Sequence, residues 1–124
     1  MIDVLIVEDE KKLSEAYQLI LERHGYTTRT AGNGEEALAA LDASLPDVVL
    51  LDIKMPKMDG ITFLRELQKR SKRPAVIVFS NMDNQEDIDE AYRLGAEHYI
   101  LKAWASPKEL IRIVEAAVSE RPKA

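Results

Sequence analysis

The sequence feature that most constrains the fold is the apolar run Val48–Leu51, which ends in the acid Asp52. Half of the run is β-branched, and a short apolar run of this kind favours a strand buried on both faces. Such strands belong to parallel sheets covered by helices, which bind ligands beyond the carboxyl ends of their strands. An isolated aspartate in this place is commonly a turn residue or a helix cap, so its role depends on the rest of the chain.

Composition limits the chain to one globular domain without thiol chemistry. Its 124 residues are enough for one domain with a substantial core and too few for two. Apolar residues make up 46% and charged residues 31%, which is typical of globular proteins and not of disordered ones. The sequence has no cysteine, which excludes disulfides, thiolate metal sites and a cysteine nucleophile.

Charge and hydropathy argue against two classes of partner. The net charge of −5 suggests no basic surface for nucleic acid, so we expect no direct nucleic-acid binding. No apolar run approaches the roughly 20 residues that span a bilayer, and the first residues lack the basic and apolar regions of a signal peptide. We therefore expect no membrane partner and a cytoplasmic location.

Strand-like and helix-like stretches alternate five times along the chain. Five β-α units predict an α/β domain with one doubly wound parallel sheet in the strand order 2-1-3-4-5, whose order reverses between strands 1 and 3. We expect one domain over residues 1–120 and a frayed tail at 121–124. The expected strands are residues 2–7, 26–31, 48–52, 75–79 and 97–101.

Four of the five expected strands end in polar residues, and in a parallel sheet these ends share one edge. The side chains of Glu8, Asp9, Asp52, Ser80 and Lys102 should therefore converge on one pocket. Three neighbouring carboxylates would raise one another's pKa unless a cation lay among them. A donor set of oxygens alone favours Mg²⁺, or Mn²⁺, over zinc.

This grouping also suits phosphoryl transfer with a carboxylate as nucleophile. A phosphoryl group on Asp52 would add about two negative charges and several hydrogen-bond acceptors. The metal ion and Lys102 could stabilise two of its oxygens, and the Ser80 hydroxyl could donate to a third.

Three further residues complete the pattern: Pro56 and Gly60 in the loop after Asp52, and Tyr99 in the fifth strand. With them, essentially the whole chain resembles the receiver domain of two-component response regulators, which have a chemotaxis-type, flavodoxin-like fold. The resemblance implies a phosphorylation-activated switch in a phosphorelay. It implies no ordinary enzyme, only a domain that assists its own phosphorylation and dephosphorylation.

The resemblance also implies a role for each residue of the pocket. Asp52 would accept the phosphoryl group from the phosphohistidine of a histidine kinase or phosphotransfer protein, assisted by Lys102. Glu8, Asp9 and the backbone carbonyl of Lys54 would hold Mg²⁺ together with Asp52. Ser80 and Tyr99 would form the switch, in which the hydroxyl moves toward the phosphoryl group and the aromatic ring turns inward.

In this family the signal leaves through the face made by the fourth helix, fifth strand and fifth helix, which would control an unknown downstream protein. The acids Asp87 and Glu90 lie on the fourth helix, and the cations Lys108 and Arg112 on the fifth. Complementary charges of this kind could support a phosphorylation-dependent homodimer. The alternative is a solvated surface that has no partner.

The sequence departs from the family pattern at three positions. Ala103 follows Lys102 where the family usually has a proline in a cis bond, and a cis bond before alanine costs about 2.5–4 kcal/mol. We expect either a trans bond with a re-routed loop or a cis bond held by packing. Trp104 is either a hydrophobic plug or a contact residue. Met82, two residues after Ser80, cannot orient a water molecule, which predicts slow loss of the phosphoryl group.

Two other functions stay open on the sequence alone. One is a metal-dependent phosphatase with Asp52 as nucleophile, although Lys54 stands where a second acid would be needed. The other is a receiver that is never phosphorylated and acts only as a protein-interaction module, for which Ala103 is the only support.

Overall fold

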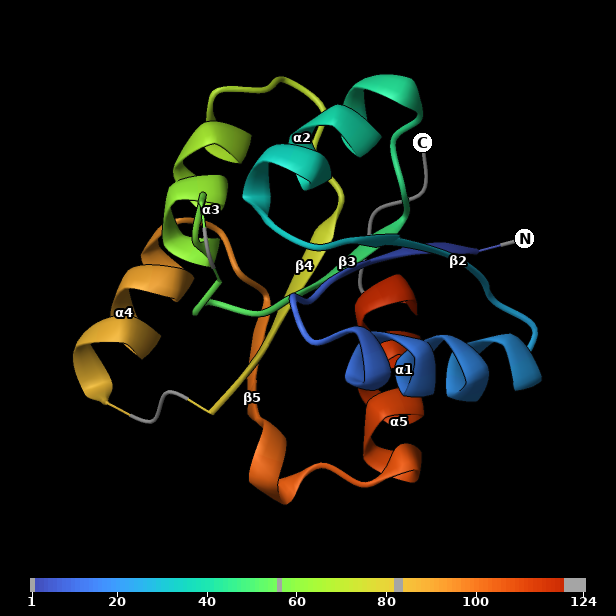
Figure 1. Cartoon of the computed structure of the whole chain (residues 1–124). Coiled ribbons are helices and arrows are strands. Elements are labelled where there is room, and N and C mark those ends of the chain that lie inside the picture. The colour runs from blue at the N-terminus through green and yellow to red at the C-terminus, as the bar shows by residue number, and fades with distance from the viewer. Residues whose placement is uncertain (1, 56, 82–83, 120–124) are drawn as a thin grey trace.

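A computed structural model describes residues 2–55, 57–81 and 84–119 and contains one parallel sheet in the order β2-β1-β3-β4-β5 (Figure 1). The predicted strand order is therefore confirmed. The strands are β1 (Asp3–Val7), β2 (Thr27–Ala31), β3 (Val48–Leu51), β4 (Ala75–Ser80) and β5 (His98–Leu101). The helices are α1 (Lys11–Arg23), α2 (Gly34–Ala43), α3 (Gly60–Gln68), α4 (Gln85–Arg93) and α5 (Pro107–Ser119), with a 3₁₀ turn, η1 (Lys102–Trp104), after β5.

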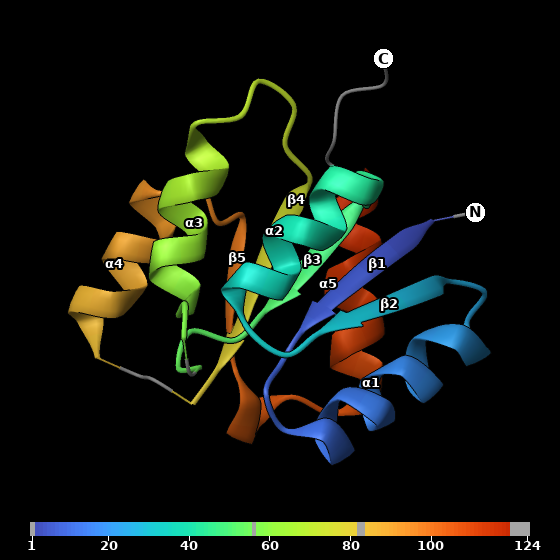
Figure 2. The same ribbon diagram turned by 45° about the horizontal axis from the view of Figure 1, so that its top comes forward.

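The sheet separates two hydrophobic layers. Helices α1 and α5 cover one face, and α2, α3 and α4 cover the other (Figure 2). Successive residues of a strand point to opposite faces, so Val4 and Ile6 pack in the layer with α5, while Leu5 and Val7 pack in the layer with α3. All four residues of β3 are buried, as the apolar run predicted.

Side-chain caps fix where the helices begin beside the site. Asn33 accepts a hydrogen bond from the Glu36 backbone N–H at the start of α2. Asp59 caps α3 and Asn84 caps α4 in the same way. At α5, the Ser106 hydroxyl accepts a hydrogen bond from the Glu109 backbone N–H. These caps hold the helix starts at the edge of the sheet where the strands end.

Two glycines end helices with positive φ angles, which favour residues without a Cβ. Gly25 follows α1 with φ +88° and Gly95 follows α4 with φ +102°. Of the helices in the described ranges, none has the length and apolar character needed to cross a bilayer.

Gly60 sits where two parts of the backbone approach closely behind the Asp52 loop. Its N–H donates to the Ile53 carbonyl at 2.8 Å. A Cβ at this position would lie 2.5 Å from the Asp52 carbonyl oxygen and 2.7 Å from the Ile53 Cα. Both neighbours are backbone atoms, so neither can yield by changing a rotamer.

We predict that Gly60→Ala lowers the free energy of unfolding by about 1–3 kcal/mol, the usual effect of overpacking. Urea denaturation measures the change. Gly32→Ala is the matched control, because a Cβ there meets only the Glu36 side chain, at 3.5 Å or more. Equal effects of the two substitutions would show that the close backbone approach at Gly60 is unimportant.

Candidate functional site

Three carboxylates gather where β1 and β3 end. The two strands are neighbours with Val7 opposite Leu51, so the residues that follow, Glu8 and Asp52, emerge side by side. Oxygen atoms of Glu8, Asp9 and Asp52 lie within 4.8 Å of one another. Glu8 and Asp52 are buried, with only 4% and 7% of their surfaces exposed, whereas Asp9 is exposed.

Lys102 joins the two buried acids from the end of β5. Its Nζ donates to Glu8 Oε1 at 2.5 Å and to Asp52 Oδ2 at 3.2 Å. The lysine side chain is itself only 11% exposed, so both ion pairs are largely shielded from water. A second donor reaches Glu8 from the backbone, because the Glu10 N–H lies 3.2 Å from Glu8 Oε2.

Burial and charge act in opposite directions on this cluster. Burial raises the pKa of Glu8 to about 7, although the hydrogen bonds from Lys102 and the Glu10 backbone N–H lower it. Burial alone would lower the pKa of Lys102, but the hydrogen bonds and charges of Glu8 and Asp52 outweigh it and raise that pKa. The ammonium ion is therefore the favoured form of Lys102, while Glu8 resists ionisation.

A cavity of about 260 Å³ opens beside these groups and collects most of the candidate residues. Ser80, at the end of β4, is fully buried and lies next to Leu101 in the β4–β5 register. Lys54 comes from the loop after β3. The cavity is lined by Asp9, Glu10, Asp52, Lys54, Ser80, Asn81 and Lys102.

Two residues that line this cavity, Glu10 and Asn81, were not predicted as site residues from the sequence. Glu10 is the third member of an acidic triplet, and Asn81 directly follows Ser80 after β4. Their positions at strand ends were the available signal. The strand-end rule picks out polar residues, but it does not say how far into the following loop the cavity extends.

The residues present fit a hard divalent cation. Every candidate ligand is an oxygen, and such sets suit Mg²⁺ or Mn²⁺. When ionised, the three carboxylates carry three negative charges against the single positive charge of Lys102. A cation would offset the remaining repulsion and the burial cost that keeps the pKa of Glu8 high.

The peptide bond between Lys102 and Ala103 is trans, since the described residues contain no cis bond. The chain continues into η1, where the Ala105 N–H donates to the Lys102 carbonyl at 3.3 Å. Of the two conformations expected here, the structure therefore has the trans bond, and whether the loop is re-routed relative to the family stays a prediction. Pro56, Met82 and the Trp104 side chain lie outside the described residues, so the expectations about them stay predictions.

Tyr99 is half-buried on β5 and packs against the core layer that contains α4. In the β4–β5 register Tyr99 lies opposite Val78 and Ser80 lies opposite Leu101, so the two candidate switch residues belong to adjacent strands.

Three of the four candidate interface residues already have side-chain partners within the chain. Glu90 forms ion pairs with Arg93 and with Arg65 of α3, so its carboxylate is already paired within the chain. Arg112 binds Glu109 one turn earlier in α5, at 2.6 Å. Asp87 accepts from the Asn84 amide at 2.8 Å, and Lys108 is exposed.

Comparison with known proteins gives a consistent family. The family described as "Response regulator receiver domain" matches residues 4–115. The chain is 39% identical over 121 residues to "Probable transcriptional regulator ycf27" of Guillardia theta, covering 98% of this chain and 47% of that protein. It is 34% identical over 113 residues to "Alkaline phosphatase synthesis transcriptional regulatory protein PhoP" of Bacillus subtilis, covering 91% and 47%.

A solved structure supports the same assignment. The response regulator receiver domain protein (CheY-like) of Methanospirillum hungatei superposes with a TM-score of 0.91 at 27% identity, over 97% of this chain and 95% of that one. This chain spans about half the length of the two curated relatives, since it covers 47% of each.

The raised pKa of Glu8 predicts a pH-dependent cost to folding. Because the folded-state pKa is about 7 and the ordinary value is 4.5, the folded protein keeps a proton that the unfolded chain has released. This contribution to stability is present below the ordinary pKa and is lost as the pH rises through 7. We expect Glu8→Gln, without divalent cation, to raise Tm by a few degrees at pH 8 relative to the parent protein, and by less at pH 5.

Differential scanning fluorimetry at both pH values measures this effect. Glu15→Gln, on an exposed acid of α1, is the control and should change Tm by the same amount at both. A Glu8→Gln shift that is equal at pH 5 and pH 8 would contradict the assignment of the raised pKa.

Proposed function

Because the chain belongs to the response regulator receiver family, we propose that Asp52 is the phosphoacceptor of a two-component signalling switch. The observation that carries the proposal is the Asp52 carboxylate itself. It lies in a cavity at the end of β3, bonded to Lys102 and close to two further carboxylates. A buried acid held only as a helix cap would need none of these neighbours.

The reaction moves a phosphoryl group from the phosphohistidine of a histidine kinase or phosphotransfer protein. An Asp52 carboxylate oxygen forms the new P–O bond while the P–N bond to the histidine ring breaks. The electron pair of that bond returns to the ring nitrogen. Since the transition state is loose and highly charged, the protein contributes mainly position and electrostatic stabilisation.

Lys102 and Ser80 provide that stabilisation. The Lys102 ammonium already bonds Asp52 Oδ2, so it is in place to donate to an oxygen of the transferred group. The raised pKa of Lys102 keeps it charged for this task. The Ser80 hydroxyl, at the end of the adjacent β4, would donate to another phosphoryl oxygen.

Glu8, Asp9 and Asp52, with the backbone carbonyl of Lys54, would hold Mg²⁺, and Mn²⁺ fits the same donors. When bound, the ion neutralises charge on the phosphoryl oxygens. Glu8 is oriented for this role by the Lys102 ammonium on one oxygen and by the Glu10 backbone N–H on the other.

The output would leave through the face formed by α4, β5 and α5. We propose that Ser80 moves toward the phosphoryl group and that the Tyr99 ring then turns inward on the adjacent strand. We propose that the partner that binds this face is a protein. The two named relatives are described as transcriptional regulators, and the part that matches this chain is about half of each. A cytoplasmic location and the absence of direct nucleic-acid binding by this chain remain predictions.

Incubation with Mg²⁺ and acetyl phosphate tests the function directly. We expect the intact mass to increase by one phosphoryl group, and Asp52→Asn to abolish the increase. Asp42→Asn is the matched control, since Asp42 is an exposed acid that pairs only with Arg70 at the surface among the contacts described. It should be phosphorylated like the parent protein.

Two other outcomes would replace the proposal. Rapid release of free phosphate over many turnovers would indicate a phosphatase with Asp52 as nucleophile. No change in mass would indicate a receiver that acts only through protein contact.

The proposed dimer interface gives a separate prediction. We expect Asp87→Lys to weaken phosphorylation-dependent dimerisation about tenfold or more, because each residue occurs twice in a symmetric dimer. Sedimentation or light scattering with and without acetyl phosphate measures this. Glu86→Lys is the control, since Glu86 lies in the same first turn of α4 and its reversal likewise places a cation at the helix N-terminus. Unchanged dimerisation of Asp87→Lys would favour a solvated face.

A further inference from the structure

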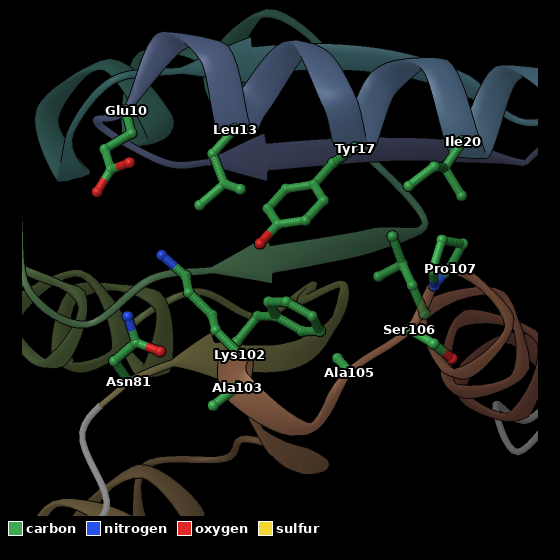
Figure 3. Close-up of a pocket in the computed structure, with 12 residues that line it drawn as sticks. Glu10, Leu13, Tyr17, Ile20, Asn81, Lys102, Ala103, Ala105, Ser106 and Pro107 are labelled. Atoms are coloured by element: carbon green, nitrogen blue, oxygen red, sulfur yellow. The ribbon is translucent and has the colours of Figure 1, made fainter.

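A second cavity lies beside the acceptor site, between α1 and the segment that joins β5 to α5 (Figure 3). Its volume is about 380 Å³, and its walls are mostly apolar, including Leu13, Ile20 and Leu110. Lys102 lines both this cavity and the cavity of the acceptor site. The lysine therefore stands between the acids and an open space into which a long, flexible side chain could swing.

Tyr17 of α1 is the aromatic residue that faces Lys102 across this space. Figure 3 shows the Tyr17 hydroxyl directed into the cavity, at the end where the Lys102 ammonium lies. The ring is fixed by an edge-to-face contact with Phe79 of β4, with centroids 5.3 Å apart and planes at 77°. Phe79 directly precedes Ser80, so the ring is anchored to the strand that carries the candidate switch hydroxyl.

The Tyr17 hydroxyl is neutral and interacts electrostatically with the charged groups of the site. Burial raises its pKa to about 12, and Lys102 is the charged group that acts on it most strongly, followed by Glu8 and Asp52. A neutral phenol can accept a hydrogen bond from an ammonium group, as well as donate one.

A hydrogen-bond acceptor beside Lys102 matters when a phosphoryl group is transferred to Asp52. Its ammonium has three N–H groups, and two of them bond Glu8 and Asp52. Transfer of a phosphoryl group to Asp52 changes one of these two acceptors, so the ammonium must follow the negative charge outward. The four-carbon stem gives it the freedom to do so and equally the freedom to turn into the cavity.

We propose that Tyr17 is a positioning residue for Lys102. Its hydroxyl accepts a hydrogen bond from the ammonium as the lysine moves from Asp52 to the transferred phosphoryl group, and its ring narrows the space into which the lysine could turn. The inference rests on the proposed function, since phosphoryl transfer to Asp52 defines the task of Lys102.

Tyr17→Phe tests the hydroxyl while it keeps the ring and its contact with Phe79. We expect phosphorylation by acetyl phosphate at saturating donor and Mg²⁺ to slow by about three- to tenfold, the effect of losing one hydrogen bond to a charged group. Mg²⁺ affinity, measured by calorimetry, should not change. Tyr26→Phe is the matched control, because Tyr26 packs against the same core layer as Tyr17 and should keep the full rate.

A double substitution separates positioning from packing. If Tyr17 acts through Lys102, Tyr17→Phe should cost nothing further in a Lys102→Ala background, where intact mass follows the slow reaction over many hours. A purely structural role would cost the same factor in both backgrounds, and that result would overturn the inference.

A readout without metal or donor completes the test. In the Mg²⁺-free protein, ¹⁵N NMR of the Lys102 ammonium should show faster proton exchange with water in Tyr17→Phe, because the N–H that is not bonded to Glu8 or Asp52 loses the hydroxyl as an acceptor. Tyr26→Phe should leave the exchange rate unchanged.

The outcomes for the two proposals are distinct. A parent protein that takes up no phosphoryl group would overturn the proposed function. A parent protein that is phosphorylated, together with a Tyr17→Phe variant of equal rate and equal ammonium exchange, would overturn only the role of Tyr17.

Discussion

The whole site depends on the burial of two carboxylates at the ends of neighbouring strands. Glu8 and Asp52 lie side by side because β1 and β3 are paired in register, and the surrounding loops leave each less than a tenth exposed. Like charges so close in a shielded place are unfavourable unless cations compensate. Lys102 compensates in part, but burial still raises the pKa of Glu8. A divalent ion held by these oxygens would offset the rest.

The two core layers, one on each side of the sheet, contain different residues that lie near this cluster. Tyr99 packs in the layer of α2, α3 and α4, whereas Tyr17 and Phe79 pack in the layer of α1 and α5. Lys102 and Ser80 stand at the boundary, at the ends of adjacent strands. The proposed switch residue Tyr99 and the proposed positioning residue Tyr17 therefore lie on opposite faces of the sheet, whereas the proposed output face includes α5 and so involves both layers.

Much of the fold and the membership of the site could be predicted from the sequence. Buried strands such as Val48–Leu51 and the capped helix starts at Asn33 and Ser106 are local signals, and parallel pairing brings the strand ends to one edge. The depth of the cavity and the side-chain rotamers depend on packing between distant segments. For this reason Glu10 and Asn81 could not be predicted as lining residues. The sequence indicates only that Tyr17 is one of the apolar residues on the buried side of its helix. Its contact with Phe79 depends on how α1 crosses the sheet, which periodicity does not specify.

The bond from Lys102 to Glu8 joins residues 94 positions apart, near opposite ends of the chain. The central β3 leads to Asp52, but the ammonium neighbour of Asp52 arrives only when the last strand has docked against β4. Under the proposed function, a partly assembled chain therefore lacks the cation that assists phosphoryl transfer. Phosphorylation would then be selective for molecules whose tertiary structure is complete.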